Sequence, residues 1–312
     1  MNLEPIQKLG KDLRVAARTM SDQEARFLVD YYYICQEDRK RGDNQVRSLD
    51  QSKEPNGVIA WLAEQSTAME KEIKKAIDSY TQIHPMGAWM RQIYGIGPVI
   101  SAGLLAHIDI NKAPTVGHIW RYAGLDPTSK WIGSEGAQEF VAEHGINFEL
   151  ASKTIGMSVS TIRRMATNED GKVTKKSFEK ALRRRPWNQG FKTLCWKAGQ
   201  SFMKFSNRDE CYYGHVYKER KAYEIERNER GDNKELAEQL KEKVGKTTDA
   251  YKYLCEGVLP PGQIDARARR YAVKLFLSHL HGAWYEKHFG TKPPLPYPLV
   301  HLGHAHFIPS PV

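Results

Sequence analysis

The feature that most constrains the fold is a pair of glycines, Gly95 and Gly97, which separates two apolar runs with helical spacing. A turn this tight between two helices requires the backbone freedom of glycine. The helix after the turn begins with backbone N–H groups that have no acceptor inside the helix, and such groups suit a phosphate. The sequence therefore predicts a helix-hairpin-helix, a motif that holds a nucleic-acid backbone without reading its sequence. The residues expected to contact phosphate here are Gly95, Gly97, Val99 and Ser101.

The distribution of charge predicts a polyanionic partner for the middle of the chain. The formal net charge at pH 7 is +10 over 312 residues. Residues 151–200 hold 12 Lys and Arg against 3 Asp and Glu, a net of +9, whereas residues 1–90 hold 13 against 14, a net of −1. An excess of one sign attracts the opposite sign, so nucleic acid is the favoured partner class. A solvated basic face without a partner is the alternative.

A second motif, residues 149–166, lies in the basic segment. Gly156 suits a sharp turn between two short helices, and Ser158 is placed to cap the second helix. The pattern resembles a helix-turn-helix, whose second helix enters the major groove of DNA by its N-terminal residues. Short patterns of this kind also arise by chance. The residues expected to contact DNA from here onward are Ser160, Thr161, Arg163, Arg164, Lys175, Lys176, Arg183, Arg184, Arg185, Lys192 and Lys197.

Helical periodicity covers most of the chain and period-two alternation is almost absent, which predicts an all-α fold. Helices are expected at 22–40, 57–82, 224–246 and 266–289, and loops at 40–56, 133–136 and 259–262. Leu62, Met69 and Ala76 repeat every seven residues, which fits the core of a helical hairpin or a seam between subunits. The predicted domains are an N-terminal helical dimerisation region (1–84), the helix-hairpin-helix (85–130), an inserted helix-turn-helix with its basic stretch (131–186), a C-terminal helical domain (187–290) and a tail rich in Pro and His (291–312).

The sequence Ile-Tyr-Gly-Ile-Gly-Pro-Val at 93–99, followed by Tyr-Ala-Gly-Leu-Asp-Pro at 122–127, resembles the C-terminal domain of the Piv-type DEDD transposases and invertases. Enzymes of this family mobilise insertion sequences and invert DNA segments. The resemblance covers residues 60–130 and resumes at Asn188, and the segment between is a short loop in the family. Family members pair their subunits through a coiled-coil hairpin before the glycines, so the resemblance implies a homodimer.

The resemblance also implies where catalysis would reside. The family's nuclease half is a ribonuclease-H-like domain, in which a β-sheet places four carboxylates around magnesium. About 90 residues precede the hairpin here and they predict helices. Asp12, Asp22, Glu24 and Asp30 are therefore expected to be solvated surface carboxylates, and the nuclease half is expected to be missing.

A serine nucleophile is the family's other catalytic group, and counting from Asn188 places it at Ser201. A serine that attacks a phosphodiester needs nearby cations to stabilise the developing charge. Lys192, Lys197 and Lys204 lie on neighbouring turns. An ordinary helix serine is the alternative.

Other features bear on redox state, location and metal binding. Four widely spaced cysteines predict reduced thiols rather than a disulfide framework or a zinc site. No signal peptide is evident, and no apolar run approaches the roughly 20 residues that span a membrane. We therefore expect a soluble cytoplasmic protein, associated with the bacterial nucleoid, without a metal or cofactor. His301, His304 and His306 have a spacing that suits zinc, although packing of the tail or contact with phosphate explains them as well.

These features predict a DNA-binding protein of a mobile genetic element with a role in DNA recombination. It is expected to be related to transposases but to lack their nuclease domain. The DNA can be duplex, branched or otherwise structured. One alternative is an active recombinase that uses Ser201 together with a partner nuclease. Another is a protein that binds structured RNA, since the relatives are RNA-guided.

Overall fold

The computed structural model describes residues 10–52, 57–296, 300 and 307–312. Within these residues it contains fifteen α-helices, one 3-10 turn (η1, Ile110–Lys112) and no strand, which confirms the predicted all-α class. The helices are α1 (Lys11–Arg18), α2 (Asp22–Gln51), α3 (Gly57–Ile83), α4 (Gly87–Gln92), α5 (Pro98–His107), α6 (Val116–Tyr122), α7 (Gly133–His144), α8 (Phe148–Ile155), α9 (Val159–Ala166), α10 (Lys175–Leu182), α11 (Gln189–Lys204), α12 (Tyr212–Glu229), α13 (Lys234–Lys241), α14 (Asp249–Cys255) and α15 (Pro261–Phe289).

The chain divides into two compact units. Unit 1 comprises Met1–Asp109, Gln200–His215 and Pro311–Val312, and unit 2 comprises Ile110–Gly199 and Val216–Ser310. The boundaries fall within α11 and α12, so residues 200–215 group with the N-terminal helices. The domain boundaries given above stay a prediction.

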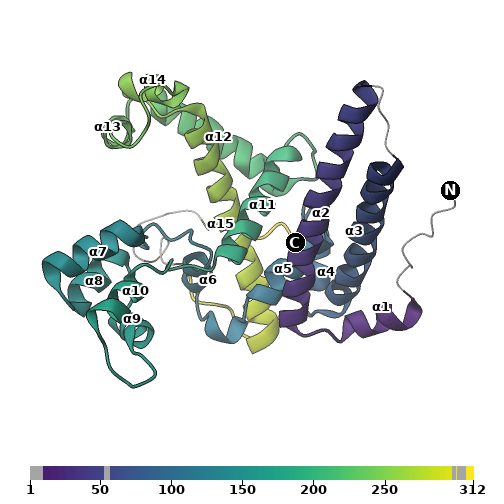
Figure 1. The fold of residues 1–312 in the computed structure, drawn as a ribbon, viewed down its shortest axis with the longest axis horizontal. Helices are drawn as coiled ribbons and strands as arrows, with labels where there is room; N and C mark the ends of the chain where they lie inside the picture. The colour runs from purple at the N-terminus through teal and green to yellow at the C-terminus, as the bar shows by residue number, and fades with distance from the viewer. Residues whose placement is uncertain (1–9, 53–56, 297–299, 301–306) are drawn as a thin grey trace. The chain divides into compact units, whose positions relative to one another are not determined.

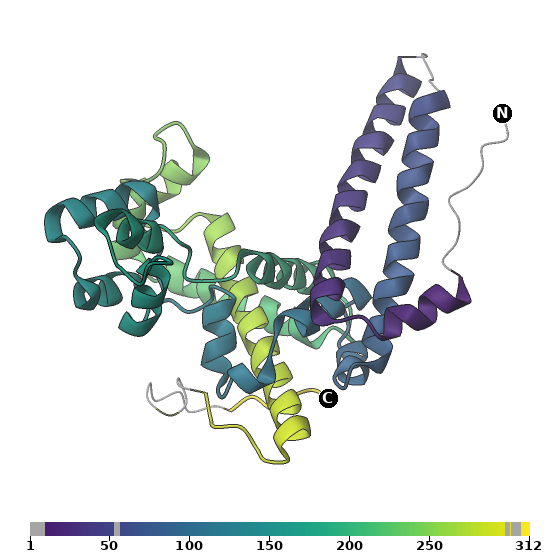
Figure 2. The same cartoon turned by 60° about the horizontal axis from the view of Figure 1, so that its bottom comes forward.

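In unit 1, α2 and α3 form a long antiparallel pair, and α5 packs against both (Figure 2). Ser21 begins α2 with a capping box to Glu24, and the Tyr80 hydroxyl of α3 donates to the Asp22 carboxylate at 2.8 Å. Ile77 is fully buried in this core, which stabilises the unit by roughly 2 kcal/mol.

The predicted loop at 40–56 is wrong for residues 40–51, which continue α2. The residues are polar because this end of the helix is largely exposed, and ion pairs hold it rather than apolar burial. Arg39 binds Asp43 at 2.9 Å and Glu70 of α3 at 2.6 Å. Gly42 also lets the helices approach closely, since a Cβ there would lie 3.0 Å from Cβ of Ala63.

Three other expected elements also differ from the structure. The helix expected at 224–246 is broken at 230–233, where Gly231 has a φ of +89° and Asp232 binds Arg227 and Arg230. The loop expected at 133–136 is the first turn of α7, because burial of later residues of that helix outweighs the weak helix propensity of glycine. In the segment expected to be a linker, Pro261 starts α15, a first-turn position that proline tolerates.

The seven-residue repeat of α3 changes from exposed to buried along the helix. Leu62 is exposed, Met69 is half-buried and Ala76 is buried in the core of unit 1. Packing in the core of the helical hairpin therefore explains the apolar residue at position 76 of the repeat. On α2, Phe27 and Ile34 are exposed apolar side chains on one helical face. Dimerisation through these helices stays a prediction.

Helices α7–α10 of unit 2 form a four-helix group, which is called the inserted domain below and is drawn together in Figure 1. Its core contains Phe140, Ile155, Ile162 and Phe178, all buried. Thr167 and Val173 form an isolated antiparallel bridge between α9 and α10. Phe178 is fully buried, which contributes roughly 2 kcal/mol to the stability of the domain.

The turn between α8 and α9 has the predicted local chemistry. Gly156 ends α8 with a φ of +69°, in the left-handed region. The Ser158 hydroxyl caps α9 by accepting from the Thr161 N–H at 3.3 Å. A Cβ at Gly156 would lie 2.2 Å from the carbonyl oxygen of Thr128, so the backbone before α7 passes directly over this turn.

We expect Gly156→Ala to reduce the free energy of unfolding by on the order of 3 kcal/mol, because it combines a left-handed φ with a backbone clash. Gly171→Ala is the matched control, since Gly171 has a φ of +73° but no atom within 4 Å of the position that a Cβ would occupy. The control should lose only about 1 kcal/mol, the cost of left-handed backbone alone. Urea unfolding of both variants measures the difference. Equal losses would show that the contact with Thr128 carries no energy.

Candidate nucleic-acid interface

The two glycines of the hairpin have different roles in the structure. Gly95 follows α4 with a φ of +91°, and a Cβ there would lie 3.3 Å from Ser201 Oγ and 3.6 Å from the Phe202 ring. Glycine is therefore required at 95 by both backbone angle and packing. Gly97 has a φ of −80° and a ψ of 173°, is exposed, and has no atom within 4 Å of the position that a Cβ would occupy. Any residue can adopt this conformation, so the fold does not require glycine at 97.

The first turn of α5 faces the open space around Gly97. Gly97 is the N-cap and Pro98 the first helical residue, which has no N–H. The N–H groups of Val99 and Ile100 follow, in the turn where a helix supplies no acceptor. The Ser101 N–H donates to the Gly97 carbonyl at 2.9 Å. The side chains of Val99 and Ser101 are buried, so Val99 offers a ligand only its backbone N–H, and the hydroxyl of Ser101 lies in the interior.

Residues of α11 and the segment after it hold the hairpin turn from within unit 1. The Ser201 hydroxyl donates to the Gly95 carbonyl. The Tyr94 ring meets the Phe205 ring edge-on at 5.5 Å, and the Cys211 thiol donates to the Tyr94 carbonyl at 3.8 Å. Within the described residues, the hydrogen bond of the Ser201 hydroxyl is to this carbonyl and to no His, Asp or Glu side chain. Attack by this serine on a phosphodiester would need a base within hydrogen-bond reach of the hydroxyl.

In the inserted domain, α9 presents one polar face. Ser160, Arg163 and Arg164 are exposed on it, whereas Thr161 is half-buried and contributes to the N-cap. The Arg163 guanidinium lies over the Phe148 ring, 4.7 Å from its centre. Stacking of this kind fixes the orientation of an arginine whose N–H groups remain at the surface.

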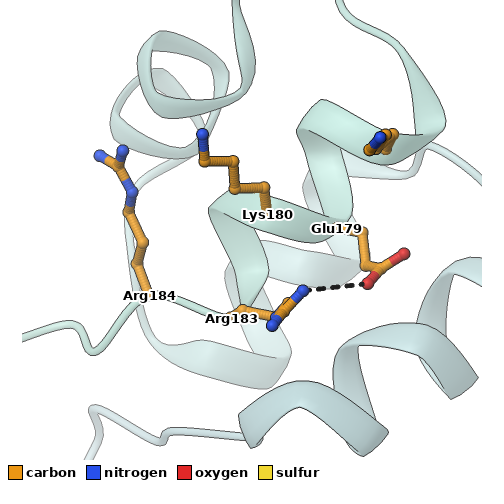
Figure 3. Close-up of a pocket in the computed structure, with 5 residues that line it drawn as sticks. Glu179, Lys180, Arg183 and Arg184 are labelled. Carbon is orange, nitrogen blue, oxygen red and sulfur yellow. Dashed lines mark ion pairs between the residues drawn. The ribbon is translucent and has the colours of Figure 1, made fainter.

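A group of cations lies on α10 and just after its end. Lys176, Glu179, Lys180, Arg183 and Arg184 line an open pocket (Figure 3). Arg183 pairs with Glu179 at 3.7 Å, while Lys180 and Arg184 extend to the other side in this view. Over the part of the chain that the structure describes, no ion pair or side-chain hydrogen bond engages Lys176, Lys180 or Arg184.

The sequence analysis did not include Lys180 among the expected DNA contacts, although the spacing of the basic residues points to it. Lys176 and Lys180 are four residues apart on one face of α10, and Arg184 follows after four more residues, just beyond the end of the helix. Lys175 is exposed at the start of the same helix. Of the remaining predicted cations, Arg185 lies over the Trp131 ring and Lys192 over the Trp187 ring, near the start of α11. Lys197, in the middle of that helix, is half-buried.

The structure thus divides the predicted site residues between the units. Gly95, Gly97, Val99, Ser101 and Ser201 lie in unit 1 around the hairpin, and the other eleven lie in unit 2. Asp12, Asp22, Glu24 and Asp30 are exposed on α1 and α2.

Among the described residues, no group of three or more His, Cys, Asp or Glu side chains is arranged to hold a metal ion. His301, His304 and His306 lie outside the described residues. The ring nitrogens of His279 and His281 are hydrogen-bonded to the carbonyls of Ile308 and Ala113, each at 2.8 Å, and burial lowers the pKa of both. In the described part of the chain, every helix is too short or too polar to cross a membrane.

Ser201→Ala should lower the free energy of unfolding by about 1 kcal/mol, because it leaves the half-buried Gly95 carbonyl without its donor. Thr193→Ala on the same helix is the control: its hydroxyl is exposed and bonds the Gln189 carbonyl of its own helix. That control should change stability by less than about 0.5 kcal/mol. Thermal and urea unfolding measure both, and identical behaviour would mean that Ser201 does not hold the turn.

Comparison with known families places the hairpin in context. Residues 88–139 match the model of the family described as Transposase IS116/IS110/IS902. The match runs from α4 through α6 into α7 and includes all four predicted hairpin residues. Comparisons with curated proteins and with solved structures give no match. The family match supports a transposase-related role in a mobile element, with nucleic acid as the partner. Residues 88–139 of this chain are therefore similar to a transposase region of the IS116/IS110/IS902 type.

Proposed function

We propose that this chain binds DNA through its backbone phosphates, as a transposase-related protein of a mobile element that does not itself cut DNA. The observation that carries the proposal is the set of cations on α10 and just after its end. Lys176, Lys180 and Arg184 line one pocket without a carboxylate partner among the described residues. Phosphates placed there would replace condensed counterions, and the release of those counterions favours binding.

The hairpin supplies a second phosphate contact. The fold does not require glycine at 97, and the missing side chain leaves the backbone there open to a ligand. The N–H groups of Val99 and Ile100 are donors for an anion, and the positive end of α5 adds to the attraction. This contact carries no sequence preference.

Helix α9 supplies the sequence preference. Its outward residues Ser160, Arg163 and Arg164 lie at or just after the N-terminus of a capped helix, the region by which a helix-turn-helix meets base edges. An arginine bound in bidentate fashion to guanine is the commonest specific contact in the major groove. The stacking of Arg163 on Phe148 holds its guanidinium in place for that role.

The alternative, a recombinase that uses Ser201 with a partner nuclease, is in accord with the family match but not with the surroundings of the serine. The Ser201 hydroxyl donates a hydrogen bond to the Gly95 carbonyl, which is too weak a base to remove its proton, whereas attack on a phosphodiester needs a base that does so. A covalent protein–DNA adduct that Ser201→Ala abolishes would establish the alternative. Binding of a folded RNA in preference to duplex and junction DNA would establish the other alternative, an RNA-binding protein.

Affinity for DNA should fall steeply with salt, with a log–log slope near −5 if about six phosphates are contacted. Replacing Lys176, Lys180 and Arg184 together by Ala should make this slope shallower by about 2.7, which is about 0.9 for each lost contact. The control replaces three exposed lysines of unit 1, Lys11, Lys71 and Lys74, and removes the same charge. Fluorescence anisotropy across a salt series measures both slopes. Equal slopes for the α10 variant and the wild type would refute the α10 contact.

Gly97→Ala should leave the free energy of unfolding unchanged within about 0.5 kcal/mol, since its backbone is extended and the space is open. The same change should weaken binding to duplex, junction and single-stranded DNA alike, by severalfold, because a methyl group blocks the approach of phosphate to the N–H groups. Gly97→Glu should weaken binding further by adding negative charge. Native gel shift with each DNA measures the effect, and unchanged affinity in both variants would remove the hairpin from the interface.

A further inference from the structure

A linked set of side chains surrounds the junction between the inserted domain and α11. The Arg185 guanidinium lies 4.7 Å from the centre of the Trp131 ring, and the Lys192 ammonium lies 3.8 Å from that of Trp187. The Gln189 side-chain oxygen joins the two pairs, accepting from Arg185 Nη1 at 2.8 Å and from Trp187 Nε1 at 3.4 Å. We call Trp131, Arg185, Trp187, Gln189 and Lys192 the tryptophan–cation cluster. All five residues lie in unit 2.

The two indole rings of the cluster are each held by a further contact. The Trp131 N–H donates to the Arg183 carbonyl at 2.9 Å. Trp187 packs on Gly124, whose φ is +65° and where a Cβ would lie 2.8 Å from the indole. Trp131 nevertheless remains 46 % exposed. A large aromatic ring that is fixed in place and still exposed is ready for a planar partner at little cost in entropy.

The cluster also has an excess of positive charge. Partial burial lowers the pKa of Lys192, and the nearby charges of Arg185 and Arg270 lower it further. Burial likewise lowers the pKa of Arg270 of α15, with Arg267 and Arg269 adding to the effect and Glu224 opposing it. In the part of the chain that the structure describes, no carboxylate pairs with Arg185, Lys192 or Arg270. An anion placed among them would relieve their mutual repulsion.

We propose that the tryptophan–cation cluster binds unpaired nucleotides, with phosphate against Arg185, Lys192 and Arg270 and a base stacked on Trp131. A ring face next to cations matches a base next to its phosphate, the arrangement by which proteins hold single strands. In a duplex the base faces are covered by their neighbours, so the Trp131 ring selects strands that are open. The inference deepens the proposed function and rests on it, because it names the form of nucleic acid that unit 2 engages at the junction.

The experiment uses the full chain and four fluorescent probes of equal length: oligothymidylate, oligouridylate, a DNA duplex and the same duplex with an unpaired gap. Trp131→Ala should weaken binding to the single strands and the gapped duplex at least about fivefold, the loss of one stacked base. Binding to the intact duplex should stay within about twofold. Trp131→Phe keeps a ring and should recover most of the affinity. Trp61→Ala, which removes another exposed tryptophan from α3 in unit 1, is the control and should change nothing.

A second readout separates contact from a structural effect. The chain has seven tryptophans, and binding of a stacked base quenches the one that it touches. Trp131→Phe should bind oligothymidylate or oligouridylate while losing part of the fluorescence quench that the wild type shows. A comparison of the two probes tells which strand type the cluster prefers. Circular dichroism and thermal unfolding show whether each variant is folded.

The outcomes distinguish this inference from the proposed function. If Trp131→Ala weakens single strands and duplex equally, or weakens neither, the cluster is not a site for unpaired nucleotides, whatever the α10 variants do. A different outcome would refute only the proposed function: the affinity of the wild type for duplex does not depend on salt, and Trp131→Ala still weakens binding to single strands. In that case phosphate binding by α10 and the hairpin is refuted, and the site for unpaired nucleotides at the cluster is supported.

Discussion

The hairpin of unit 1 depends on the left-handed turn at Gly95. The turn positions the first residues of α5, and it persists because residues far along the chain pack against it. Ser201 accounts for one contact through its hydroxyl, and Phe202 and Phe205 close the space in which a side chain at 95 would sit. A hairpin of this kind is usually attributed to local sequence, but here residues 200–215 complete it. The N–H groups at the start of α5 are therefore presented by a tertiary contact as much as by the two glycines.

The local chemistry of the fold could be predicted from the sequence because it depends on neighbours in the chain. The Ser158 cap, the left-handed Gly156 and the helical class all follow from short-range rules. The continuation of α2 through residues 40–51 did not follow, because its polar residues are stabilised by ion pairs to α3 rather than by an apolar stripe. Helix propensity and hydrophobic pattern carry no information about such pairs.

The same limit applies to the candidate site. Composition located the basic segment, yet it could not separate cations that have counter-ions from those that do not. Arg183 is compensated by Glu179, whereas Lys180, which the sequence analysis omitted, belongs to the uncompensated set on α10. Likewise, the sequence presents Gly95 and Gly97 as equivalent members of one turn. Only the three-dimensional structure shows that one glycine is needed by the fold and the other is not. The contact of Ser201 with Gly95 joins residues too far apart for any local rule to foresee.

The way in which the inserted domain meets the rest of unit 2 has a consequence for how such a chain can change. The domain has its own buried core, and the residues at its two ends, Trp131 and Arg185, lie against each other. A segment whose entry and exit are adjacent can be exchanged for a short surface loop without moving the helices on either side. The domain can therefore change without a change in the helices around it. It can acquire, alter or lose a binding preference while the hairpin that it accompanies keeps its own geometry.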